Sequence, residues 1–262
     1  MLTTNPFAAL VVPVPPAFLQ AYVVLMIALV VVGTLFDIIH KGNAKYFFND
    51  WRKAKTKRTR KIGGGEIASS VLKSAVVDVL MSGEFCNSRR RIAHLLTMYG
   101  FLIYLITTVI MIFRYDNPAV PTPRLLPMLW TVGALMICVG GYWFWFFIRV
   151  DVTAEGNSRF RVVRADLFVL SLLANATTAL IWAYTQFAGY AVLANVFLGL
   201  YVIATTVLFG SIPWSKFAHM FFKPAAALQK RLELASGQWR NLPAAADKPA
   251  TFGRASTQPR HF

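Results

Sequence analysis

The sequence predicts an all-α integral membrane protein: a five-transmembrane-helix bundle with a cytoplasmic amphipathic helix and a disordered C-terminal tail. Of its 262 residues, 56% are hydrophobic, and the mean hydropathy is positive at +0.52. Several apolar runs reach the roughly 20 residues that a helix needs to cross the hydrocarbon core of a bilayer. The expected spans are 17–39, 93–113, 125–148, 165–188 and 190–211.

The distribution of basic residues predicts an orientation. Of the 27 Lys and Arg residues, 25 fall in 41–91, in 149–164 and in the tail from Ser211, which five spans place on one side. Only Arg114 and Arg124 fall on the other side. Because cytoplasmic loops are enriched in Lys and Arg, we expect a multi-pass protein of the bacterial inner (cytoplasmic) membrane with a periplasmic N-terminus and a cytoplasmic C-terminus. The net charge of +16 then indicates contact with membrane lipid, and no nucleic acid is expected as a partner.

The hydropathy pattern divides the chain into a membrane domain, 1–223, and a cytoplasmic tail, 224–262. The membrane domain includes a basic cytoplasmic loop, 41–92. Within this loop, apolar residues near 66–81 gather on one helical face, which predicts a short amphipathic helix lying on the membrane or against a partner. The tail begins with a helix-like stretch, 225–236, and then becomes rich in Pro, Ala and polar residues, which predicts disorder.

The basic run 53–61, KAKTKRTRK, allows two interpretations. Such a run next to a membrane span commonly binds anionic lipid through its charge. Alternatively, it forms a docking surface for an acidic soluble subunit. The sequence leaves both interpretations open.

Two histidines are candidates for a cofactor site. His94 lies near the start of span two and His219 near the end of span five, so the predicted topology brings both to the cytoplasmic face. An ionisable residue at a membrane span is costly and therefore indicates a function. Two neutral imidazoles on different helices at one depth can ligate the iron of one haem b from opposite sides. The alternative for each is an interfacial histidine among the headgroups, and His261 in the polar tail is expected to be solvated.

Other charged residues accompany this candidate site. Arg90 and Arg91 precede the first histidine and Lys216 precedes the second, so these three are candidates for contacts with the haem propionates. The enrichment of cytoplasmic loops in basic residues explains them equally well. At the cytoplasmic end of span one, Asp37 and His40 are candidates for hydrogen-bonding and protonating a quinone head, or else they mark a helix end that reaches water.

The five-span layout with histidines in spans two and five resembles the cytochrome b superfamily of the respiratory nitrate reductase gamma subunit. The resemblance implies that His94 and His219 correspond to the ligands of the inner of two b haems. The outer ligands would be expected ten residues after the first histidine and eighteen before the second, where this chain has Tyr104 and Tyr201. It therefore implies a two-haem scaffold reduced to one inner haem, or to none.

A narrower resemblance is to the membrane anchor associated with dissimilatory adenylylsulfate reductase in some sulfur-oxidising bacteria. It implies a partner, a cytoplasmic flavin and iron–sulfur enzyme that exchanges electrons between sulfite or adenylylsulfate and membrane quinone. The stretches that carry it are VPVPPAF, GTLFDIIHKG, SGEFCNSRRRIAHLLTMYGFLIYLITT and SIPWSKFAHMFFKP.

Two functional hypotheses follow. In the first, the chain is an electron-transfer subunit, non-catalytic or quinone-reactive, that uses one haem b. In the second, it is a haem-free anchor that only tethers the soluble enzyme near the quinone pool. A transporter is disfavoured, because Asn175 and Asn195 are the main polar residues within the spans and such amides commonly join helices. If span five stays regular past Pro213, Tyr201 lies on the same face as His219 and about 27 Å from it.

Overall fold

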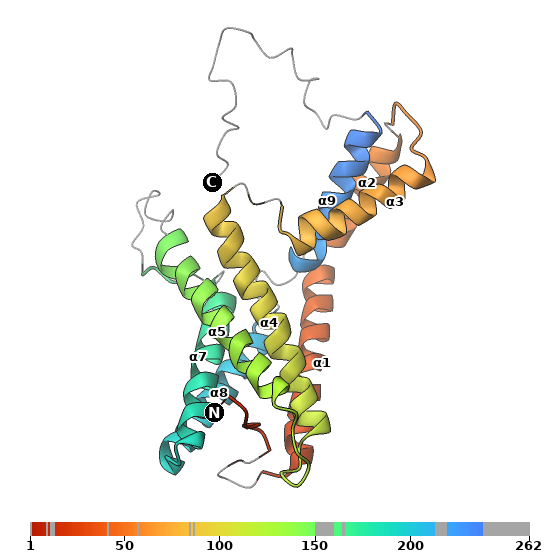
Figure 1. Ribbon diagram of the computed structural model, residues 1–262. Helices are drawn as coiled ribbons and strands as arrows, with labels where there is room; N and C mark the ends of the chain where they lie inside the picture. Colours follow the sequence, from red (N-terminus) through yellow and green to blue (C-terminus); the bar gives the residue numbers. More distant parts are fainter. Residues whose placement is uncertain are drawn as a thin grey trace. The chain divides into compact units, whose positions relative to one another are not determined.

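All regular structure in the described part of the chain is helical (Figure 1). The computed structural model describes residues 2–8, 10, 14–40, 42–56, 58–83, 85, 87–149, 160–163, 166–212 and 219–237. Within these ranges, the side chains of Asn43 and of residues 219–221 are not described.

Five long apolar helices confirm the five predicted spans. Each is long enough to cross a bilayer and carries few charges, so the chain is an all-α membrane protein. The helices are α1 (Pro16–His40), α4 (Ser88–Arg114), α5 (Leu125–Trp143) with its continuation as the π-helix η2 (Phe144–Ile148), α7 (Leu167–Phe187) and α8 (Ala191–Gly210).

The chain folds into two compact units. The bundle unit comprises Met1–Asp37 and Ser88–Ala218, and the short-helix unit comprises Ile38–Asn87 and His219–Phe262. The two units are defined by which residues pack together. The predicted division into residues 1–223 and 224–262 was instead a division between membrane and cytoplasm, and it stays a prediction. The short-helix unit therefore joins the segment between the first two spans to the segment after the last.

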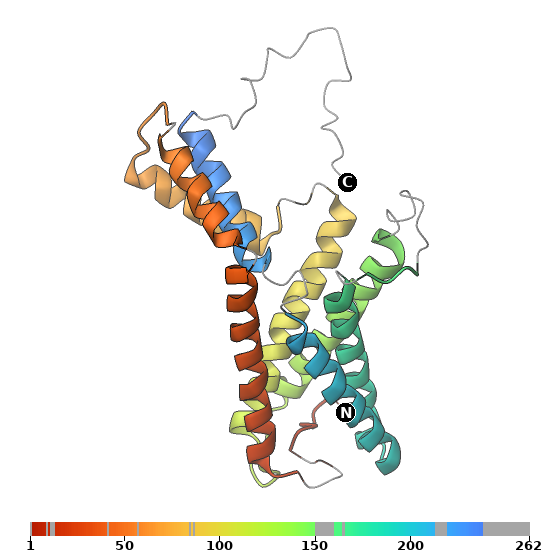
Figure 2. The same cartoon turned by 180° about the vertical axis from the view of Figure 1, so that it is seen from behind.

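In the bundle unit, α4 packs along α5, α5 against α7, and α7 along α8. Figure 2 shows α7 and α8 side by side from behind. The α4–α5 contact is close because its residues are small: a Cβ added to Gly133 would lie 2.8 Å from the backbone nitrogen of Tyr104, and one added to Gly140 would lie 2.7 Å from the carbonyl oxygen of Ala93. Small residues let helix backbones approach closely in membranes, where burial of apolar surface does not drive association.

Helix α1 is held to the rest of the bundle unit by polar contacts. The Tyr22 hydroxyl donates to the carbonyl oxygen of Val202 on α8 at 3.0 Å. The Gln20 amide donates to the carboxylate of Asp116, just after α4, at 3.2 Å. Polar side-chain contacts of this kind commonly join neighbouring helices in membrane proteins.

The short-helix unit consists of α2 (Asn43–Thr56), α3 (Gly64–Lys73), the π-helix η1 (Ser74–Leu80) and α9 (His219–Ala235). Helix α3 runs into η1 without a break, which confirms a helix near 66–81. Helix α9 confirms the helical start of the tail. After α2 the chain returns to the end of α9, where the backbone N–H of Arg60 donates to the Ser236 carbonyl oxygen at 3.2 Å. The predicted disorder concerns residues 241–262, which lie outside the described residues.

Candidate functional site

His94 lies in the second turn of α4, and its side chain is exposed. The neighbouring residue, Ala93, is buried against the Gly140 position of α5. Because Ala93 lies in the α4–α5 contact, the exposed side chain of the next residue, His94, lies outside that contact. Arg90 and Arg91, in the first turn of the same helix, are half-buried.

His219 does not lie on a continuation of span five. The condition of a regular helix from Tyr201 to His219 is not met, because α8 ends at Gly210 and His219 is the first residue of α9. Ser211 has φ −85° and ψ 2°, outside helical geometry. The residue before a proline is disfavoured in the α conformation, so Ile212 cannot readily extend the helix. The estimate of 27 Å therefore does not apply. Pro213, Lys216 and the His219 side chain lie outside the described residues.

The two candidate quinone contacts on α1 differ in their surroundings. Asp37 is buried, with 2% of its surface exposed, whereas His40 at the helix end is exposed. Gly33 and Thr34, one turn earlier, are also buried, so this face of α1 is small and polar. A buried carboxyl group on an apolar helix is a candidate for proton handling.

Tyr104 and Tyr201 are buried in the bundle, at 5% and 7% exposure. Tyr104 stacks on Trp130 of α5 with ring centroids 5.3 Å apart, and Tyr201 stacks on Trp182 of α7 at 5.5 Å. Phe7, from the segment before α1, contacts both indoles edge-on, at 5.8 Å from Trp130 and 5.3 Å from Trp182. We call these five residues the aromatic cluster. Its rings occupy the interior at the two positions that the resemblance assigns to an outer haem.

Sequence reasoning missed three members of the aromatic cluster. Trp130 and Trp182 are fully buried, and Phe7 is 5% exposed. Tryptophans near helix ends are typical of membrane interfaces, so nothing local distinguished these two from an interfacial belt. The one available signal was their placement on spans three and four, next to the spans that carry the tyrosines.

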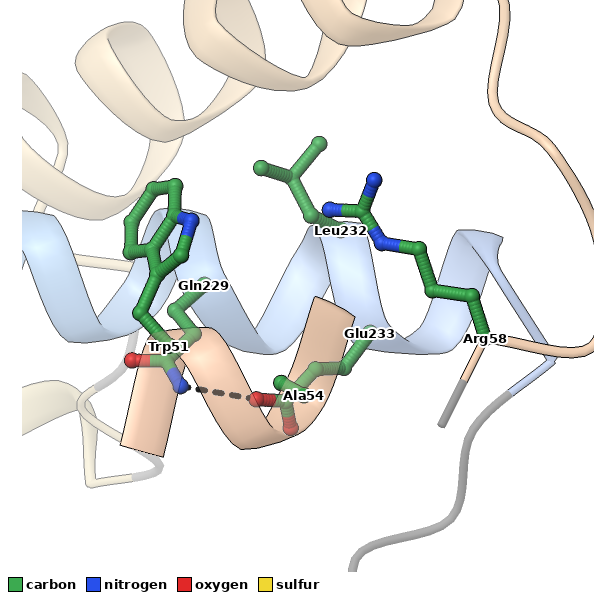
Figure 3. Close-up of a pocket in the computed structure, with 6 residues that line it drawn as sticks. All are labelled: Trp51, Ala54, Arg58, Gln229, Leu232 and Glu233. Carbon is green, nitrogen blue, oxygen red and sulfur yellow. Dashed lines mark hydrogen bonds between the residues drawn. The ribbon is translucent and has the colours of Figure 1, made fainter. Parts of the chain in front are cut away.

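Two cavities among the described residues are lined by residues other than the predicted site residues. One lies between α2 and α9 and has a volume of about 10 Å³, room for about one water molecule (Figure 3). In it the Gln229 amide donates to the Glu233 carboxylate at 2.8 Å. A larger hollow of about 300 Å³ is lined by Trp145, Phe146, Phe147 and Phe160.

A bidentate ion pair joins α9 to η1 within the short-helix unit. Arg231 on α9 donates from Nε and Nη2 to the two carboxylate oxygens of Asp78 on η1, both at 2.7 Å. The Asp78 side chain is 10% exposed and that of Arg231 is 31% exposed. The hydrogen bonds from Arg231 lower the pKa of Asp78 below its ordinary value of 3.8, although burial acts in the opposite direction.

We expect Arg231→Gln to lower the free energy of unfolding of the short-helix unit by about 1–3 kcal/mol, because it removes a bidentate charge-assisted contact. The measurement is hydrogen exchange of the η1 amides, which should become faster. Arg52→Gln, at an exposed position of α2, should leave their exchange unchanged.

Because the folded-state pKa of Asp78 is lowered, the stability that the Asp78–Arg231 pair contributes is fully present above about pH 4 and is lost as the pH falls through the folded-state pKa. Equal exchange at pH 7 in the wild-type chain and in Arg231→Gln would contradict this role.

Five apolar spans and a unit of short basic helices define the class of the protein as a multi-pass helical membrane protein. Comparison with known proteins found no matching family model, no similar curated protein and no similar solved structure.

Proposed function

We propose that this chain is the membrane anchor and electron-transfer subunit of a respiratory complex, with its N-terminus in the periplasm and its C-terminus in the cytoplasm. The observation that carries the anchoring role is the short-helix unit. It is a compact body outside the five candidate spans, built from the segment between α1 and α4 together with α9. A protein that only crossed the membrane would not need this second body. Exposed cations on its surface, among them Lys53, Lys55 and Arg58, suit an acidic soluble partner.

The partner that the sequence resemblance supports is a flavin and iron–sulfur enzyme similar to adenylylsulfate reductase. The anchor would hold this enzyme at the cytoplasmic face, where electrons pass between its clusters and the membrane quinone. The buried Asp37 and the exposed His40 are the proposed contacts that hydrogen-bond and protonate a quinone head, because both are ionisable groups at the end of span α1.

For the redox role we propose one haem b, held by His94 and His219, which would relay electrons between the docked enzyme and quinone. Arg90, Arg91 and Lys216 are the proposed propionate contacts. The position of His94 at the start of a candidate span, with an exposed side chain, supports this assignment. His94 lies ten residues before Tyr104 on α4, about 15 Å along the helix, so a group bound to it would be well separated from the Tyr104 end of the aromatic cluster.

The haem test is a pyridine-haemochrome assay on the purified chain. We expect one b haem per polypeptide, and we expect His94→Ala and His219→Ala each to abolish its low-spin spectrum while membrane insertion persists. Loss of a residue that only supports a ligand typically lowers affinity about 10- to 100-fold, so complete loss marks a direct ligand. His40→Ala and His261→Ala are the matched controls and should keep the spectrum. Two haems per chain would contradict the assignment.

One observation favours the alternative, a haem-free anchor. Because α8 ends at Gly210, His219 belongs to α9, which is not one of the five candidate spans, whereas the resemblance implies a ligand on span five. In this alternative, electrons pass directly from an iron–sulfur cluster of the partner to a quinone. A fully active complex that contains no haem would establish the alternative, while the anchoring role would remain.

A further inference from the structure

The helix formed by α3 and η1 turns a polar face toward the interior of its unit. Ser70, Ser74 and Asp78 recur every four residues along the side that packs against α9. Ser74 is 4% exposed, and Asp78 holds Arg231. A helix of a water-soluble domain ordinarily buries its apolar stripe, so this arrangement is reversed.

The opposite face of the same helix is apolar and uncovered. Leu72, Val76 and Leu80 also recur every four residues, offset by two positions from the polar stripe, and they are 65%, 39% and 49% exposed. Val71 and Met81 beside them are 46% and 49% exposed. A continuous exposed apolar surface of this kind marks a site of interaction with lipid or with another protein.

We propose that this face, defined by Leu72, Val76 and Leu80, lies in the headgroup region of the bilayer that the five spans cross. The first argument is the short connection to the membrane. Helix η1 ends at Leu80 and the span α4 begins at Ser88, so eight residue steps of at most about 3.6 Å join the apolar face to a spanning helix. Such a tether keeps the local concentration of lipid at this face high.

The second argument is charge. The apolar face is accompanied by exposed cations, with Lys73 directly after Leu72 and Lys61 just before α3. Helices that lie in the interface combine an apolar face with basic residues, because anionic headgroups attract the cations while the apolar side chains enter the acyl boundary. The docking cations Lys53 and Lys55 lie on a different helix, α2, so one unit can hold lipid with α3–η1 and a soluble partner with α2.

The test uses the full-length chain in nanodiscs of phosphatidylcholine and phosphatidylglycerol, without any partner. Cys86 and Cys138 are replaced by serine, a single cysteine is introduced by Val76→Cys, and a bimane label is attached. We expect blue-shifted emission and quenching by doxyl-labelled lipid that is several-fold stronger than for the same label at Lys55→Cys. A label at Leu72→Cys should repeat the Val76 result. The three labelled positions, Leu72, Val76 and Lys55, are exposed, so we expect the labelled variants to fold.

Quenching of the Val76 and Leu72 labels by aqueous iodide, as strong as at Lys55 and with no effect of the lipid quencher, would overturn the proposal. A face that lies in water in the absence of any partner would instead be available to a soluble protein. The measurement involves neither haem nor quinone nor the soluble enzyme, so its outcome is independent of the proposed function.

Discussion

Gly133→Leu is expected to separate α4 from α5 and to destabilise the bundle by about 3 kcal/mol or more. A Cβ at residue 133 would lie 2.8 Å from the backbone nitrogen of Tyr104 and 2.9 Å from the carbonyl oxygen of Gly100. These are backbone atoms, which cannot rotate away, so the two helices must move apart. Overpacking costs about 1–3 kcal/mol where side chains can adjust, and more where backbones must shift. Unfolding of the purified chain in mixed micelles, followed by circular dichroism during SDS titration, measures the loss.

The matched control is Gly199→Leu on α8. Gly199 is exposed, and an added Cβ there meets nothing within 4 Å, so the stability should change by no more than about 0.5 kcal/mol. Because the introduced residue is the same, the control removes any general effect of a leucine on insertion. A bundle that tolerates leucine at 133 as well as at 199 would show that the close α4–α5 contact is not required.

Trp130→Ala should cost about 3–5 kcal/mol, because it opens a cavity in the aromatic cluster. Trp130 is fully buried, stacks on Tyr104 and meets Phe7 edge-on. Its indole N–H also donates to the Thr108 hydroxyl at 2.9 Å, so the substitution leaves that hydroxyl without its donor. The same SDS titration measures this loss, and near-ultraviolet circular dichroism should show that the remaining rings lose their fixed arrangement.

Two further variants interpret the Trp130 result. Trp130→Phe keeps an aromatic ring and should recover more than half of the lost stability, because it forfeits mainly the hydrogen bond and part of the volume. Phe187→Ala, at a position of α7 with 63% of its surface exposed, should have little effect on packing. If Trp130→Ala were no more costly than Phe187→Ala, the aromatic cluster would be incidental to stability.

The spans were predictable from the sequence because their signal is local. A run of about 20 apolar residues specifies a membrane helix whatever its neighbours are, and the observed bounds differ from the predicted ones by five residues or fewer. The short-helix unit was only partly predictable. Its helices near 66–81 and 225–236 were expected, but their pairing was not, since Asp78 and Arg231 are 153 residues apart.

For the candidate site, the sequence placed His94 correctly near the start of a spanning helix. It also placed the end of span five within one residue, at 211 against Gly210, but it did not predict that His219 begins a separate helix, because the apolar residues 217–222 continue the hydropathy of the span beyond Pro213. The positions of Tyr104 and Tyr201 could be inferred from the resemblance. Their stacking on two tryptophans depends on how four helices pack, which no local pattern encodes.

The distance along the chain between Asp78 and Arg231 has a consequence for synthesis. A ribosome adds about 5–20 residues per second, so the 153 positions between them take roughly 8–30 s to make. During that time four of the five spans are synthesised, whereas α9 does not yet exist. The polar stripe of α3 and η1 therefore has no protein partner during this period and must be solvated by water. The lipid that we propose on the other face would hold this helix in place during the wait. A chain that ends between residues 211 and 218 would therefore contain all five spans but would lack α9, the partner of α3 and η1.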